Sequence, residues 1–198
     1  MLSKKINRPA AASRSAGTPS PRGADPLNDL QDFVDSLQEE WLAEDPKLPA
    51  QGLPVVARLV RLGYYIARRV DANFERFNLS RGEFEVLAVL VRNPELNITP
   101  KILQTKILIT SGGLSNRIRR LEEKGLVTRT PDPIDRRGVI LKATPEGREL
   151  TLKAVTSHMQ VENDFMKGMP EEKQRELAQL LKELILSQQG ALNRDGLR

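Results

Sequence analysis

The stretch that most constrains the fold runs from residue 110 to residue 125 and reads TSGGLSNRIRRLEEKG. On a helical wheel, Ile118 and Leu121 lie within about 40° of Leu114, which predicts an amphipathic helix with one buried stripe. The Thr-Ser pair at its start can cap the helix, and Gly125 stands where a left-handed residue would end it. The rest of the chain must therefore provide a surface that covers the stripe.

The opposite face of this helix carries small residues and hydrogen-bond donors. Small residues allow close approach to a partner, and amide and guanidinium donors suit base edges and phosphates. We therefore predict a helix that reads the major groove of DNA, although a solvated surface face explains this helix alone equally well. The candidate DNA-binding residues are Ser111, Gly112, Gly113, Ser115, Asn116, Arg119 and Arg120.

The flanking residues predict a winged helix-turn-helix. A short helix over residues 99–107 is joined by a tight link to the helix that follows residue 110, which is the arrangement of a helix-turn-helix. Residues 126–130 and 138–143 are β-competent, and the loop between them makes a hairpin that serves as the wing.

The tip of this wing is predicted to contact DNA. Arg136 and Arg137 would reach phosphates or a narrow minor groove, where the potential is most negative. Asp135 is expected to stabilise the wing by holding an arginine, although a turn-forming aspartate is an equally good interpretation. Residues 101–137 contain nine basic and four acidic side chains, a net charge of +5, whereas residues 27–100 carry −4. The positive charge of the folded part therefore coincides with the predicted reading head.

Helical periodicity predicts further helices around this region. We expect an additional N-terminal helix over residues 25–45, begun by Asp25-Pro26, and dimerisation helices over residues 53–77 and 145–189. The DNA-binding region spans residues 79–144 and starts at a capping box of Ser80 and Glu83. The predicted buried stripe of the long helix is Val56, Leu59, Val60, Ile66, Ala67, Val70 and Phe74. The fold class is thus mainly α with a small β-wing.

The composition excludes several function classes. The 198 residues include no cysteine and one histidine, His158, so a metal centre or a Ser/His triad is not expected, and we predict neither an enzyme nor a cofactor. No apolar run reaches the length of a membrane span. Residues 1–24 are rich in Ser, Ala, Pro and Arg and are expected to form a disordered basic tail. That tail adds non-specific attraction to phosphates or is an inert extension.

Two motifs carry a family resemblance over most of the chain. The runs SGGLSNRIRRLEEKGLVTR and DRRGVILKATPEGREL resemble the signature of MarR-type winged-helix transcriptional regulators, with Asp135, Arg137, Thr144 and Gly147 at the pattern positions. Ala143 departs from it, since a leucine usually precedes the threonine. The resemblance implies a homodimer that binds double-stranded DNA at a pseudo-palindromic operator, without a membrane partner, in the cytoplasm at the nucleoid.

A closer similarity suggests the effector. The N-terminal run LQDFVDSLQEEW, together with Trp41, Glu85, Arg117 and Arg129, resembles the PecS-like, urate-responsive branch of this family. The resemblance implies that these four residues bind a small anionic aromatic effector such as urate, which releases a repressor from its operator. Members of the branch commonly have aspartate where Glu85 stands, so a phenolic or other aromatic carboxylate is the alternative. A winged helix that binds protein instead of DNA is a third interpretation.

For two of these residues, physical arguments alone also predict a specific contact. Glu85 stands in a nearly continuous apolar helix, where an ionised carboxylate is costly unless it is paired. Arg117 lies about 60° from Leu114 on the wheel, on the flank of the buried stripe, and an Arg117–Glu85 pair would satisfy both groups. A purely structural buried ion pair explains the two residues nearly as well. For Trp41 and Arg129 the corresponding interpretations are core packing and an exposed or phosphate-contacting strand residue.

Overall fold

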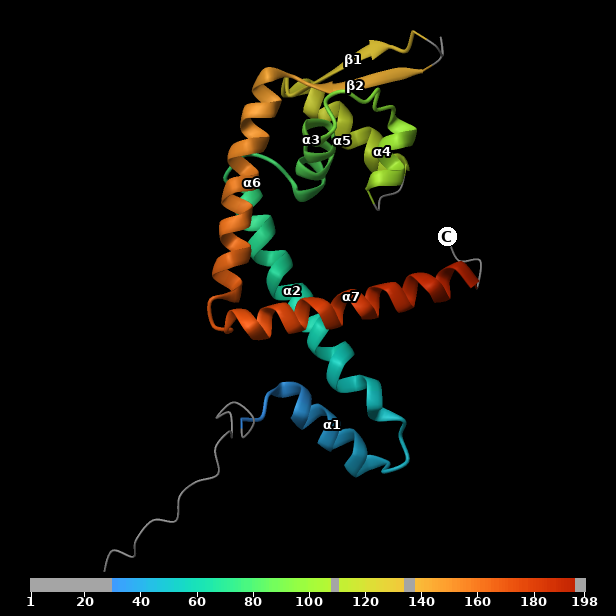
Figure 1. The fold of residues 1–198 in the computed structure, drawn as a ribbon, viewed down its shortest axis with the longest axis vertical. Coiled ribbons are helices and arrows are strands. Elements are labelled where there is room, and N and C mark those ends of the chain that lie inside the picture. Colours follow the sequence, from blue (N-terminus) through green and yellow to red (C-terminus); the bar gives the residue numbers. More distant parts are fainter. Residues whose placement is uncertain (1–29, 108–110, 134–137, 195–198) are drawn as a thin grey trace, which may run out of the picture. The chain divides into compact units, whose positions relative to one another are not determined.

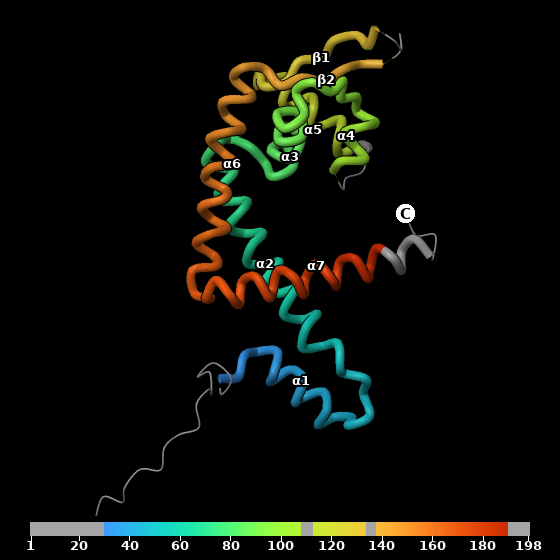
Figure 2. Tube along the Cα trace, in the orientation of Figure 1, coloured from blue at the N-terminus to red at the C-terminus, as the bar shows by residue number. Residues whose placement is uncertain are grey.

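The computed structural model describes residues 30–107, 111–133 and 138–194 (Figures 1 and 2). The predicted tail over residues 1–24 lies outside this part of the chain. The described elements are, in order, α1 (Phe33–Glu44), a 3₁₀ turn (Ala50–Gly52), α2 (Leu53–Glu75), α3 (Arg81–Arg92), α4 (Pro100–Lys106), α5 (Ser111–Glu123), β1 (Val127–Pro131), β2 (Val139–Ala143), α6 (Pro145–Met166) and α7 (Glu171–Arg194). The predicted fold class, mainly α with a small β-wing, is confirmed.

The chain divides into two compact units, Met1–Leu59 and Val60–Arg198, which are described separately. In the first unit, α1 begins at Phe33, because Asp32 and Asp35 form a capping box. The Asp32 carboxylate accepts from the Val34 N–H at 2.7 Å, and the Asp35 carboxylate accepts from the Asp32 N–H at 2.9 Å. The predicted start near Asp25-Pro26 lies outside the described residues, but residues 30–32 are not helical. The prediction of a continuous helix from residue 25 was therefore wrong.

An arginine ties the beginning of α1 to the beginning of α2. The Arg58 guanidinium donates to Asp32 at 2.9 Å and to Asp35 at 2.7 Å. The Arg58 hydrogen bond is the main reason that the pKa of Asp32 lies below its usual range. The pKa of Asp35 is lowered first by the Asp32 N–H and then by Arg58. These three side chains orient α1 within the first unit.

The second unit is built around α3, as the near-continuous apolar sequence of that helix predicted. Val86 and Leu87 are fully buried, and α3 packs against α5, α6 and β2 (Figure 1). The predicted stripe of α5 is buried too, with Leu114 at 3%, Ile118 at 2% and Leu121 at 0% exposure. The α5 helix is therefore held to the core by one face, which leaves its polar face outside.

The two strands form an antiparallel ribbon whose register runs from Val127↔Ala143 to Pro131↔Val139. The other edge of β2 carries a single bridge, in which the Leu141 N–H donates to the Ile98 carbonyl at 2.8 Å. This bridge connects the ribbon to the segment before α4. The hairpin predicted as a wing is thus present, and each strand begins one residue later than predicted.

The Thr-x-x-Gly motif joins the foot of the wing to α6. The Thr144 hydroxyl donates to the Gly125 carbonyl at 2.8 Å and accepts from the Gly147 N–H at 2.9 Å, so it caps α6 and holds the end of α5. A Cβ atom on Gly147 would stand 2.1 Å from the Leu126 carbonyl oxygen. Glycine is therefore required there by the close approach of two backbone segments. Gly125 has φ +69°, as its predicted place at the end of α5 requires.

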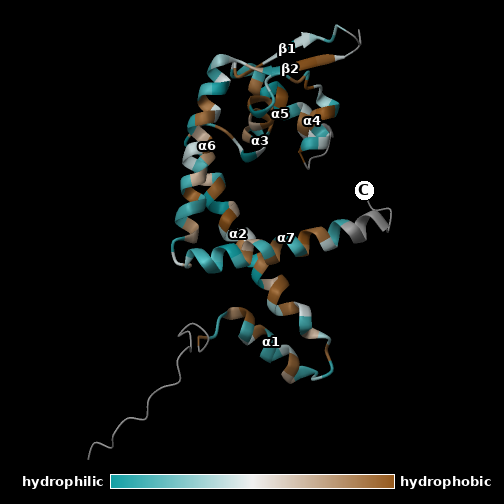
Figure 3. Cartoon of the chain, viewed as in Figure 1, coloured by the Kyte–Doolittle hydropathy of each residue, from teal (hydrophilic) through white to brown (hydrophobic). Residues whose placement is uncertain are grey.

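Within one chain, the predicted stripe of α2 is only partly buried. In α2, Val70 and Phe74 are buried, but Val56, Val60 and Ile66 are 57%, 69% and 41% exposed. In α7, Leu180 and Ile185 are 57% and 56% exposed as well. Figure 3 shows the apolar residues on both helices. The physical reason is that the described part of this single chain supplies no surface that covers these stripes.

We predict that Gly147→Ala destabilises the fold by about 1–3 kcal/mol, the usual cost of overpacking. The added methyl group would collide with the Leu126 carbonyl, which is backbone and cannot rotate away. Denaturant unfolding followed by circular dichroism measures the change. Gly168→Ala is the matched control, because a Cβ there meets nothing within 4 Å, and we expect a change below about 0.5 kcal/mol. Equal stabilities of the two variants would contradict this account of the motif.

We also predict that Arg58→Met raises the pKa values of Asp32 and Asp35 towards their ordinary range. A lowered carboxyl pKa stabilises the folded state above the unfolded-state pKa, and this stabilisation is lost as the pH falls through the folded-state value. The variant should therefore show a smaller loss of stability between neutral and acidic pH. Carboxyl-carbon NMR titration measures both groups, with Arg68→Met as the control. Unchanged titration of Asp32 would show that Arg58 is not its partner.

Candidate nucleic-acid interface

The exposed face of α5 is the main candidate for binding DNA. Ser115, Asn116, Arg119 and Arg120 are exposed on the side opposite the buried stripe, and Gly113 is half-buried. Arg119 forms an ion pair with Glu123 one turn later. The predicted residues Ser111 and Gly112 belong to the first turn of the helix. The structure thus brings most of the predicted reading residues together on one helix, with arginines in its second half.

The wing extends from this helix. The Asp132 N–H donates to the Gly138 carbonyl at 3.1 Å, which closes the ribbon before its tip. The predicted tip residues Asp135, Arg136 and Arg137 lie outside the described residues, so their contacts with DNA stay a prediction. The base of the ribbon contacts α5, so the two predicted DNA-binding elements form one body.

Arg129, predicted as an effector ligand, contacts α5. Its Nε donates to the Glu122 carboxylate at 2.7 Å, and 40% of the arginine side chain is exposed. This ion pair connects β1 to the last turn of α5. Sequence reasoning missed Glu122 as a partner, because a glutamate near the end of a helix is expected to face solvent.

The predicted ion pair of Arg117 and Glu85 is present, but its two charged groups are too far apart for a hydrogen bond. Arg117 Nη1 lies 3.8 Å from Glu85 Oε2, which is within ion-pair range but too far for a hydrogen bond. The side chains are 33% and 43% exposed, so the expectation of a buried Glu85 was wrong. Glu85 lies on the one side of α3 that its neighbours leave partly open.

A glycine gives Arg117 its place. A Cβ atom on Gly82 would stand 2.1 Å from Arg117 Cζ, so the guanidinium lies directly against the α3 backbone. Gly82 is the second residue of α3 and lacks the Cβ atom that would meet the guanidinium. Sequence reasoning missed this residue. Trp41, the fourth predicted effector residue, lies on α1 in the first unit and is 53% exposed there, which argues against the alternative interpretation of core packing and leaves its role as an effector ligand a prediction.

A cavity of about 530 Å³ borders Glu85, between α3, the end of α4 and α6. Of the four predicted effector residues, Glu85 is the one that lines it. Its remaining lining is mostly apolar, with cationic groups at Arg92 and Lys106 and the ring of His158. Such a combination suits a flat apolar ligand that carries a negative charge. The main apolar lining residues are Phe84, Val89, Ile107, Leu152, Val155 and Met159.

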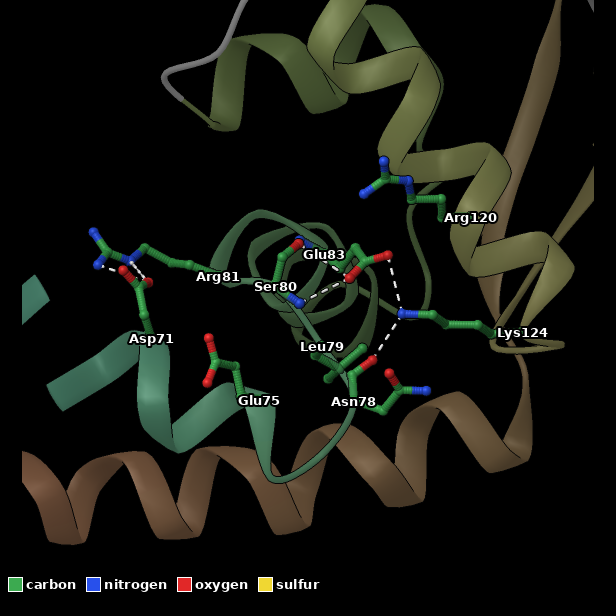
Figure 4. Close-up of a pocket in the computed structure, with 9 residues that line it drawn as sticks. All are labelled: Asp71, Glu75, Asn78, Leu79, Ser80, Arg81, Glu83, Arg120 and Lys124. Atoms are coloured by element: carbon green, nitrogen blue, oxygen red, sulfur yellow. Dashed lines mark hydrogen bonds and ion pairs between the residues drawn. The ribbon is translucent and has the colours of Figure 1, made fainter. Parts of the chain in front are cut away.

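A different acid is the buried one in α3. Glu83 is 3% exposed and accepts from the Ser80 N–H at 2.8 Å, as the predicted capping box requires. It also accepts from Lys124 Nζ at 3.1 Å (Figure 4). Burial raises the pKa of this carboxyl, but the bonds from Ser80 and Lys124 outweigh burial and leave it below the usual range. The capping motif revealed Glu83, whereas nothing in the sequence indicated its bond to Lys124.

Metal and membrane sites find no support in the described part of the chain. No group of three potential metal ligands occurs among these residues. His158 packs at 5.1 Å from the ring of Phe74, and its Nε2 lies 3.3 Å from Glu162. None of the described helices is both long and apolar enough to cross a membrane.

Comparisons with known proteins agree with this geometry. The MarR family model matches residues 77–138. The HTH-type transcriptional regulator PecS of Dickeya dadantii (strain 3937) is 32% identical over 149 residues, which cover 75% of this chain and 90% of PecS.

Solved structures share the fold. The MepR–DNA complex of S. aureus matches with a TM-score of 0.61 at 21% identity, covering 67% of this chain and 98% of MepR. Wild-type MarR from E. coli matches with a TM-score of 0.57 at 25% identity, covering 65% and 96%. With a regulator aligned over nearly its full length and a winged helix-turn-helix at its centre, this chain belongs to the MarR family of winged-helix transcriptional regulators, which are not enzymes.

Proposed function

We propose that this protein is a homodimeric repressor that binds a pseudo-palindromic operator and is released by a small anionic aromatic such as urate. The observation that carries the proposal is the two-sided character of α5. Its apolar stripe is buried in the core, and its arginine- and amide-bearing face is exposed beside the β-ribbon. This arrangement suits a helix in the major groove with a wing along the backbone.

The exposed apolar stripes support the dimer. Side chains such as Val60 in α2 and Leu180 in α7 are more than half exposed, and large exposed apolar patches mark surfaces that bind another molecule. A second copy of the chain supplies the same stripes, so an isologous interface can cover both sets. Two reading helices related by a two-fold axis then match two half-sites about one turn of DNA apart.

The cavity beside Glu85 supports an effector that is apolar, flat and anionic. Its volume of about 530 Å³ falls within the usual range for small-molecule sites. Urate is the first candidate, because of the similarity to the PecS-like branch at Trp41, Glu85, Arg117 and Arg129. An aromatic acid is the second. CouR from Rhodococcus jostii RHA1, whose structure matches with a TM-score of 0.54 at 25% identity, was solved bound to p-coumaroyl-CoA.

The open pair of Arg117 and Glu85 suggests how the signal reaches DNA. Arg117 belongs to α5, and Glu85 belongs to α3, which lines the cavity. An anion bound at the Glu85 side of the cavity would compete with Glu85 for the guanidinium, and the 3.8 Å separation supports this because no hydrogen bond holds the pair together. A change in the tilt of α5 worth about 1–3 kcal/mol, typical of coupling between sites, is enough for release.

The DNA-binding part is tested with the duplex that lies upstream of the protein's own gene and a scrambled duplex of equal length. We predict binding that falls steeply with salt, and that Arg120→Ala lowers affinity for both duplexes and reduces the salt slope by about 1, as loss of one phosphate contact does. Lys153→Ala is the control, because Lys153 lies on α6 and pairs with Glu149. Absence of binding to any duplex would instead favour a protein partner.

The effector part is tested by adding urate or p-coumarate to the protein–DNA complex. We predict that one of them releases the duplex, and that Arg117→Ala reduces the effect of that compound at least about fivefold, the lower end of typical coupling. Fluorescence anisotropy of a labelled duplex measures release, and calorimetry measures effector binding. Arg148→Ala is the matched control, because Arg148 is an exposed arginine at the start of α6, whereas the partner of Glu85 is Arg117. If Arg117→Ala leaves both quantities unchanged, the pocket assignment is wrong.

A further inference from the structure

We propose that Lys124 is the positioning residue that fixes the DNA-reading helix α5 against the ends of α2 and α3. This inference rests on the proposed DNA-binding function and names the residue that sets the orientation of α5. Lys124 Nζ donates to the Asn78 carbonyl at 2.7 Å and to Glu83 Oε1 at 3.1 Å (Figure 4). One ammonium group thus contacts the turn after α2 and the first turn of α3, while its own backbone belongs to the end of α5.

The acceptor from α2 is held in a defined turn. Asn78 has φ +54°, its N–H donates to the Glu75 carbonyl at 2.9 Å, and the Leu79 N–H donates to Phe74 at 3.1 Å. These two bonds form the Schellman arrangement that ends many helices. The carbonyl groups at a helix C-terminus carry partial negative charge, so a cation is favourable there. The Asn78 carbonyl therefore offers Lys124 a fixed acceptor.

The acceptor on α3 is the Glu83 carboxylate, which needs a cationic partner because it is charged and buried. The Glu83 side chain is 3% exposed, whereas that of Lys124 is 29% exposed. Removing one partner of a buried ion pair leaves an uncompensated charge, which is strongly unfavourable. Conformations in which Lys124 stays in contact with Glu83 are therefore strongly favoured.

The Lys124 side chain starts from an equally fixed point. The next residue, Gly125, has φ +69°, and its N–H donates to the Glu122 carbonyl at 2.9 Å. The Leu126 N–H donates to the Leu121 carbonyl at the same distance, so α5 also ends in a Schellman arrangement. The backbone is therefore held in a defined turn at the end of α2 and at the end of α5. The Lys124 side chain connects these two turns and fixes their relative position.

The consequence concerns the spacing of two reading helices. The α2 helix bears the exposed apolar stripe assigned above to the dimer, and α5 bears the DNA-reading face. Lys124 connects the end of α2 directly to the end of α5. An operator with two half-sites is sensitive to the angle of each reading helix, whereas non-specific binding depends mainly on charge. Loss of Lys124 should therefore reduce specificity more than general affinity for DNA.

The test uses a duplex that the full-length wild type enriches from a random pool, and a scrambled duplex of equal length. We expect Lys124→Met to lower operator affinity at least about tenfold, within the usual range of coupling between sites. The scrambled duplex and the salt slope should change little. Lys124→Arg should restore operator affinity to within about threefold, because a guanidinium can donate to both acceptors. Lys153→Met is the matched control, since Lys153 pairs with Glu149 on the exposed side of α6.

Two results would overturn the inference. A parallel loss for both duplexes, with a salt slope reduced by about 1, would make Lys124 a phosphate contact. Unchanged operator affinity would make it irrelevant to positioning. If Lys124→Met does not fold, Glu83→Gln is the variant to test, because it removes the buried charge but keeps an acceptor for the Ser80 N–H. We expect it to lower affinity for the operator and to leave affinity for the scrambled duplex unchanged. Where both variants fold, the double variant should be no weaker than Lys124→Met alone, since coupled residues are not additive.

The two proposals fail in different ways. If the wild type enriches no duplex, the proposed DNA-binding function is wrong. The positioning of α5 is then decided by NMR, in which the backbone amide shifts of residues 113–123 should move in Lys124→Met and stay in place in Lys153→Met. If the wild type binds and the variants behave as it does, the DNA-binding function stands and the positioning role of Lys124 is rejected.

Discussion

The burial of α3 is the constraint on which the second unit depends. A helix with residues such as Val86 and Leu87 at 0% exposure needs neighbours on nearly every side, and here α5, α6 and β2 supply them. Each neighbour buries one apolar side against α3 and keeps its other side free. The polar face of α5 is outside because Leu114, Ile118 and Leu121 must be inside. The surface that we propose to read DNA is therefore a consequence of how the core is covered.

Periodicity and end signals predicted most of this fold. The Ser80–Glu83 capping box, the Thr144 cap and Gly125 all stand where the sequence placed them, because these motifs act within a few residues. The start of α1 was predicted too early, since the Asp32 capping box was not recognised. The α2 stripe is only partly buried within one chain, because apolar spacing indicates that a surface needs cover but not which molecule provides it.

The candidate site was predictable to a smaller extent. The Arg117–Glu85 contact followed from two charged residues beside apolar stripes, whereas its openness depends on packing that periodicity does not describe. The partners of Arg129 and Lys124 could not be predicted, because Glu122 and Glu83 already had adequate local explanations. The contact between Gly82 and Arg117 could not be predicted either, because it joins two helices that are distant in the sequence.

The ribbon has one further consequence, for self-association. A wing must project from its domain, so β1 presents a row of backbone groups that no described segment pairs, and such an edge can recruit a strand from another molecule. Pro131 at the end of β1 has no N–H to donate, which interrupts the row of donors that a further strand would need. The proline thereby protects the edge of the proposed wing against aggregation and leaves association between copies to the apolar stripes that we propose for the dimer.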